Sequence, residues 1–145
     1  MNRRQVRASR GECDRGSASV ELVLVTPLLM VVLLVVVALG RLADARLVVT
    51  DAAHQAARAA SLARTEHAAR AQAARAAATA LQEAGATCRH PRVSLSTSGL
   101  NPGANVAAKV SCIADLSHLT HTWAPGHVPL TGTAFSVVDS FRGTP

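Results

Sequence analysis

The sequence predicts an α+β protein in which one N-terminal transmembrane helix continues into a long alanine-rich helix, followed by a small antiparallel sheet of about three strands. Three features predict this order: an apolar run near the N-terminus, an alanine-rich stretch without glycine or proline, and a final stretch where apolar and polar residues alternate between turn signals. A chain of 145 residues has room for one small domain.

The apolar run covers Val20–Leu39, and its part from Leu28 to Leu39 is apolar without interruption. Twenty helical residues at a rise of about 1.5 Å span about 30 Å, the thickness of the hydrocarbon core of a bilayer. The alternative is a cleaved secretory signal, whose apolar region is usually about 7–15 residues long. The only nearby small-x-small site is Ala43-Asp44-Ala45. The length of the run therefore favours a retained helix.

Charge predicts the orientation of this helix. Five arginines precede the apolar run, against Glu12 and Asp14. Arginines on the N-terminal side place that end in the cytoplasm, so everything from Arg41 onward is expected outside. Pro27 predicts a kink or local loosening within the helix, because it leaves the carbonyl of Val23 without its usual partner.

Glu21 is the charged residue inside the apolar run. An ionised carboxylate at the centre of a bilayer costs about 2.5–3.5 kcal/mol on insertion scales, and less near the interface. Glu21 lies one turn into the run. Its position alone is compatible with a snorkelling side chain at the level of the headgroups and with a carboxylate that pairs with a partner's cation.

The stretch Arg41–Ala84 has no glycine or proline, and it is dominated by alanine, the best helix former. The helix is expected to end at Gly85, and an interruption of the helix is expected near Ser61–Glu66. Small side chains permit close packing on a partner helix or on the chain's own C-terminal domain, and the pattern leaves both open. Such side chains include Ala53, Ala57 and Ala60.

Beyond Gly85 the pattern changes to short alternating segments separated by turns. Val93 and Leu95 belong to the first segment, and Val106–Cys112 alternates in the second. After Pro125 and Pro129, the third segment runs from Phe135 and Val137 towards Phe141 at period two. These segments predict about three antiparallel strands, and the helix must cover one face of their sheet.

Two of the three cysteines are expected outside the cytoplasm, where disulfides persist. Cys13 lies in the leader, whereas Cys88 and Cys112 follow the membrane segment. A bridge between Cys88 and Cys112 would contribute about 3 kcal/mol in the chain-entropy model. Two unrelated buried thiols are the alternative.

Composition and motifs argue against catalysis, metal binding and nucleic-acid binding. The chain has a net charge of +6, but only 2% aromatic residues to form the stacking platforms of a single-strand binder. His118, His121 and His127 match no HExxH pattern, and loop histidines around Trp123 are the simpler interpretation. No phosphate loop or nucleophile elbow stands out. We therefore expect neither enzymatic activity nor a cofactor, a metal site or a nucleic-acid partner.

The stretch Arg15-Gly16-Ser17-Ala18-Ser19-Val20-Glu21-Leu22 resembles the processing site of type IV pilins and pseudopilins. In that family a basic leader ends in glycine, the prepilin peptidase cuts after it, and glutamate is the fifth residue of the mature chain. The resemblance implies that Gly16 ends the leader, that Ser17 becomes the N-terminus, and that Glu21 is the family's acid. Glu21 would then pair with the N-terminal ammonium of a neighbouring subunit and set the register between helices.

The longer stretch from Arg15 to Ser61 resembles the TadE-like family of the Flp (tight adherence) pilus system, and the C-terminal segment is similar to that family's tail. Leu22 departs from the pattern, because Phe or Tyr usually follows the glutamate. The matching features are Arg15-Gly16, Val20-Glu21, Pro27-Leu28-Leu29, Gly40-Arg41 and the alanine-rich Asp51–Ala60.

Residues and resemblance together divide the chain into a basic cytoplasmic leader (1–16), a transmembrane helix (17–40), an alanine-rich extracytoplasmic helix (41–85) and a small β-rich domain (86–145). They predict a TadE-like minor pilin or pseudopilin, a cell-membrane component of Flp-type pilus assembly. The expected partners are membrane lipid, prepilin peptidase and TadF-like and Flp-type pilins, with homo- or hetero-oligomers formed through the N-terminal helix. The alternatives are a secreted soluble binding protein released by signal peptidase and a single-pass surface protein unrelated to pili.

Overall fold

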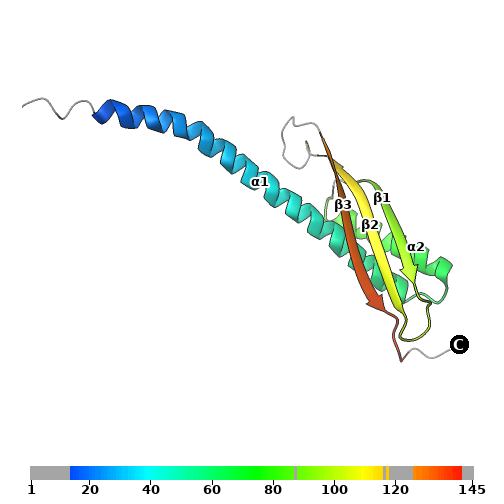
Figure 1. Cartoon of the computed structure of the whole chain (residues 1–145). Helices are drawn as coiled ribbons and strands as arrows, with labels where there is room; N and C mark the ends of the chain where they lie inside the picture. Colours follow the sequence, from blue (N-terminus) through cyan, green and yellow to red (C-terminus); the bar gives the residue numbers. More distant parts are fainter. Residues whose placement is uncertain (1–13, 87, 116, 118–125, 142–145) are drawn as a thin grey trace, which may run out of the picture. The chain divides into compact units, whose positions relative to one another are not determined.

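The computed structural model describes residues 14–86, 88–115, 117 and 126–141, with side chains from Val20 onward (Figure 1). The fold is α+β, as the sequence predicts. The elements follow the order α1 (Asp14–Ser61), α2 (Glu66–Glu83), β1 (Cys88–Thr97), β2 (Asn105–Asp115) and β3 (His127–Val137). The chain divides into two compact units, Met1–Val37 and Ala38–Pro145.

The first unit contains the N-terminal part of α1, which remains helical through Pro27. Thr26 lies directly before the proline, and its Oγ1 donates a hydrogen bond to the carbonyl of Leu22 over 2.7 Å. This bond pairs the hydroxyl of Thr26 with a carbonyl of its own helix. The hydroxyl therefore stays hydrogen-bonded even in an apolar environment. The kink expected at Pro27 stays a prediction.

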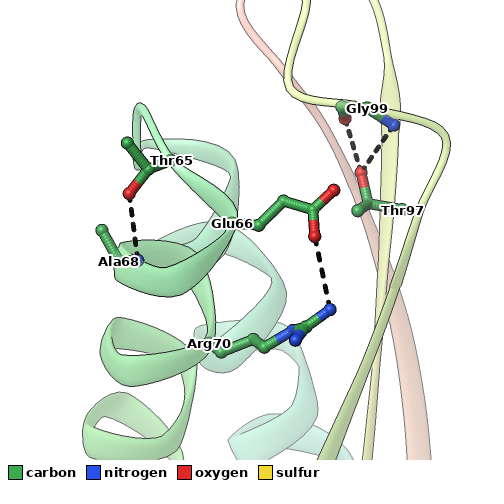
Figure 2. Close-up of polar contacts among 6 residues, drawn as sticks. All are labelled: Thr65, Glu66, Ala68, Arg70, Thr97 and Gly99. Carbon is green, nitrogen blue, oxygen red and sulfur yellow. Dashed lines mark hydrogen bonds and ion pairs between the residues drawn. The ribbon is translucent and has the colours of Figure 1, made fainter.

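In the second unit the predicted interruption between the helices is confirmed, because α1 ends at Ser61 and α2 begins at Glu66. Thr65 is the N-cap of α2, and its side chain accepts a hydrogen bond from the backbone N–H of Ala68 over 3.2 Å (Figure 2). Glu66 places a negative charge in the first turn, where the helix dipole favours it, and pairs with Arg70 at 3.3 Å.

The predicted stop after α2 is also confirmed. Gly85 takes a positive φ of 62°, a conformation in which glycine carries no penalty. The backbone N–H of Ala86 then donates to the carbonyl of Leu81 over 2.9 Å, which is the pattern of a Schellman motif. The chain turns here from α2 into β1.

The three strands form one antiparallel sheet in the order β1-β2-β3 (Figure 1). The turn from β1 to β2 is closed by the side chain of Thr97, whose Oγ1 accepts a hydrogen bond from the N–H of Gly99 over 3.0 Å (Figure 2). The register of β1 shifts between Arg89 and Arg92, and His90 within this bulge has a φ of 52°.

The helices cover one face of the sheet with small side chains. Ala53, Ala57 and Ala60 of α1 are fully buried in the chain's own core. Of the two packing modes that the sequence leaves open, the structure therefore shows packing on the chain's own C-terminal domain. The sheet contributes alternate residues of β2, which are Val106, Ala108, Val110, Cys112 and Ala114.

The structure corrects the predicted third strand. β3 begins earlier, at His127, and ends at Val137, so Phe141 lies beyond it. Its buried residues are Leu130, Gly132 and Ala134, whereas Phe135 is 72% exposed. The reason is the approach of α1: a Cβ added to Gly132 would lie 2.6 Å from the Cα of Thr50 and from the carbonyl oxygen of Val49. No side chain fits between β3 and α1 at Gly132, so the face of β3 that contains Gly132 packs on the helix and Phe135, on the opposite face, points away.

This close approach predicts that Gly132→Ala destabilises the protein by about 1–3 kcal/mol, because the new methyl group would meet backbone atoms that cannot move aside cheaply. Urea denaturation of the full-length protein in detergent, followed by tryptophan fluorescence, measures the change. The matched control is Gly40→Ala in α1, where nothing lies within 4 Å of the added Cβ. That control should be neutral or stabilising by up to about 1 kcal/mol. Equal stabilities of the two variants would contradict the prediction.

Candidate membrane anchor and assembly site

The N-terminal half of α1 presents an apolar surface that nothing in its own unit covers. From Val20 to Leu39 the large apolar side chains are between 38% and 70% exposed. None of the most apolar 18-residue window is buried, and among the residues that the structure describes this is the one helix long and apolar enough to cross a membrane. A core helix of a soluble protein would be mostly buried, so the exposure of this surface is compatible with a membrane anchor.

The predicted assembly residues lie at the start of this surface. Gly16 and Ser17 fall within α1, at positions whose side chains the structure does not describe, and Glu21 follows one helical turn later with an exposed side chain. No ion pair reaches Glu21 from the part of the chain that the structure describes. The processing site and the role of Glu21 therefore stay predictions. Cys13 lies outside the described residues.

The two cysteines that follow the apolar run come together between neighbouring strands. Cys88 begins β1, Cys112 lies near the end of β2, and the structure joins them in a disulfide with their Cα atoms 5.5 Å apart. The register pairs Cys88 with Ala114, so Cys88 lies diagonal to Cys112 on the face that the helices cover. The sequence separation of 24 residues closes β1, the turn and most of β2 into one loop.

A polar cluster lies at the same end of the sheet as the disulfide, and the sequence did not predict it. The carboxylate of Asp115, of which 9% is exposed, accepts from Arg89 Nε over 2.7 Å and also contacts Nδ1 of His127. It thus links the ends of all three strands. His127 is therefore a partner of Asp115, while His118 and His121 lie outside the described residues. The available signal for this cluster in the sequence was a pair of opposite charges at strand ends. Arg89 directly follows Cys88, and Asp115 lies shortly after Cys112.

The sequence also gave no sign of a cavity in the second unit. A cavity of about 160 Å³ opens between α1, the turn after α2 and the sheet. Arg41 and Asp44 of α1 contribute its charged side chains, and the walls are apolar or backbone. No signal in the sequence marks it, because its lining comes from five separate elements.

These features define a class of protein: a small α+β domain that follows an exposed apolar N-terminal helix. The TadE-like resemblance is confirmed by comparison with protein families, because residues 16–58 match the model described as TadE-like protein. The matched stretch comprises most of α1, including Glu21, and ends before α2. No curated protein and no solved structure matches the chain.

The disulfide leads to a stability prediction. Non-reducing peptide mapping should recover the peptides of Cys88 and Cys112 joined, and the double variant Cys88→Ser, Cys112→Ser should lose about 2–4 kcal/mol because its unfolded chain is less constrained. The control is Cys13→Ser, which should not change the mapping or the stability. Labelling of both thiols in freshly isolated protein would rule out the bridge.

Proposed function

We propose that this protein is a TadE-like minor pilin or pseudopilin, a membrane-anchored structural component of Flp-type pilus assembly that is not an enzyme. The observation that carries the proposal is the coincidence of the TadE-like match at residues 16–58 with the exposed apolar helix. A protein of this kind works by holding its partners in place, so its chemistry lies in the pairing of helices within the membrane.

The basic leader orients α1 with its N-terminus in the cytoplasm. Prepilin peptidase then cuts between Gly16 and Ser17, and the new N-terminal ammonium lies one turn above Glu21. The carboxylate of Glu21 pairs with the ammonium of a neighbouring subunit, because two charges in lipid are tolerated when they neutralise one another. Helices in any other register leave Glu21 unpaired, so the pair selects one register. The neighbours are TadF-like and Flp-type pilins or a second copy.

The packing of the second unit supports a model in which the anchor makes the contacts between subunits and the second unit does not. The small side chains of α1 that could receive another helix, such as Ala53 and Ala57, are fully buried against the chain's own sheet and second helix. By contrast, the apolar side chains of the anchor are open on every side. Contacts between subunits are therefore assigned to the anchor, and the second unit acts as a folded extracytoplasmic head.

Orientation is tested with a reporter that is active only outside the cytoplasm. Fused after Pro145, it should be active, because the arginines of the leader retain the N-terminal side in the cytoplasm. The matched control carries the same reporter before Met1 and should be inactive. Activity in the cytoplasm for the C-terminal fusion would overturn the arrangement, and release of the mature protein from membranes would favour the secreted alternative.

Processing and pairing are tested separately. Wild-type protein should lose its leader and leave 129 of the 145 residues. Gly16→Val should retain the leader, because a side chain before the bond does not fit the peptidase, whereas the neighbouring Ser17→Ala should be processed normally. Glu21→Ala should insert as well as or better than wild type, since it removes a charge from the apolar run, but it should lose copurification with pilus subunits.

The measurements are intact mass, membrane level and copurification. Glu21→Gln keeps the size of the side chain and should fail in the same way as Glu21→Ala, whereas Thr26→Val, a neutral change in the same segment, should associate normally. A wild-type chain that starts at Met1 or Asn2 would contradict processing. Normal copurification and piliation with Glu21→Gln would leave Glu21 as an interfacial residue.

A further inference from the structure

The cavity in the second unit lies next to the end of the apolar run. Leu39 is the last residue of that run, and Arg41, which lines the cavity, follows it by two positions. Two helical residues rise by about 3 Å. Under the proposed function, on which this inference rests, the entrance to the cavity therefore lies at the level of the lipid headgroups on the extracytoplasmic side.

The charges of the cavity follow one another along α1. Arg41 comes first, and Asp44 follows one turn further out, about 4.5 Å along the helix. Both side chains are exposed, and no ion pair joins these two described residues. Their charges are therefore available to a ligand, and along α1 the positive group comes nearer to the end of the apolar run than the negative group.

The end of α2 adds to the negative side. Ala84 and Gly85 line the cavity, and the last turn of α2 contains no basic residue that would offset the partial negative charge of a helix C-terminus. This end of the cavity is therefore suited to a cation. Its remaining walls, such as Val48, Ala86 and Leu130, are apolar and carry no charge.

We propose that the cavity holds the headgroup of phosphatidylethanolamine. The phosphate binds the guanidinium of Arg41, and the ammonium binds the carboxylate of Asp44 beside the end of α2. A primary ammonium donates hydrogen bonds to a carboxylate. Phosphatidylcholine has no such donor, and among the residues that the structure describes none of those lining the cavity has an aromatic ring to receive a quaternary ammonium. Phosphatidylglycerol has no cation for Asp44.

The size of the cavity agrees with this ligand. A volume of about 160 Å³ is close to that of an engineered cavity that accommodates benzene. The ethanolamine part of the headgroup, counted without its phosphate, is smaller than benzene and fits, whereas a sugar ring is larger than benzene and does not. The bound lipid would tie the first turns of α1 outside the membrane to the headgroup layer and so fix the depth of the protein.

The experiment measures which lipid stays bound to the full-length protein. The protein is inserted into vesicles of phosphatidylethanolamine, phosphatidylcholine and phosphatidylglycerol in equal amounts, extracted gently, and analysed by native mass spectrometry. Wild type should retain phosphatidylethanolamine about fivefold over each competitor, the ratio that one exposed ion pair supplies. Asp44→Asn should reduce this ratio to about one, whereas Arg41→Gln should lower the retention of all three lipids, because each of them carries the phosphate.

Two controls lie on the same helix outside the cavity. Arg46→Gln and Asp51→Asn change the same charges at exposed positions and should retain the wild-type ratio. The double variant Arg41→Asp, Asp44→Arg keeps the net charge but reverses the order of charges, and it should also lose the preference. Equal retention of the three lipids by wild type would overturn the proposal, and so would loss of the preference in Arg46→Gln.

Flotation of the vesicles separates this result from a failure of the proposed function. A protein that floats with vesicles but shows no preference contradicts the headgroup site alone. A protein that does not float contradicts the membrane anchor, and with it the site that depends on the anchor.

Discussion

The close approach of β3 to α1 at Gly132 is the contact on which the second unit depends. A helix and a strand come so near here that a single added methyl group would meet backbone atoms at 2.6 Å. Side chains around this contact must be small, which accounts for the buried alanines of α1 and for Ala134 of β3. Apolar burial in this unit is thus distributed over many small groups, in place of the few large ones that fill most cores.

The two parts of α1, the part before Leu39 and the part that faces the sheet, have different surroundings. Where α1 faces the sheet, its small residues are buried and its polar residues point to solvent, as at Asp51. Before Leu39 the helix is apolar on every side and has no protein cover within its unit. One continuous secondary-structure element therefore carries two kinds of surface, and the second is long and apolar enough to cross a membrane.

Polar and covalent links close the opposite end of the sheet from the turn at Gly99. The disulfide joins β1 to β2, and Asp115 joins Arg89 of β1 to His127 of β3. The exposed partners of Asp115 limit what each ion pair contributes to stability, because solvent screens them. Their effect is on position: they hold the strand ends together beside the cavity, where Cys88 and Ala114 form part of the lining.

The sequence by itself determined the elements whose signal is local: the apolar run, the break after Ser61, the stop at Gly85, the three strands and the TadE-like stretch. Period and composition express these directly, because neighbours along the chain create them. The tertiary structure alone decided which face of β3 is buried, and it assembled the Asp115 cluster and the cavity. The period-two pattern of Phe135, Val137 and Phe141 did not say which face of β3 is buried; the approach of α1 at Gly132 decides that Phe135 lies on the exposed one. Such outcomes depend on distances between elements remote in sequence, and no local pattern encodes those distances.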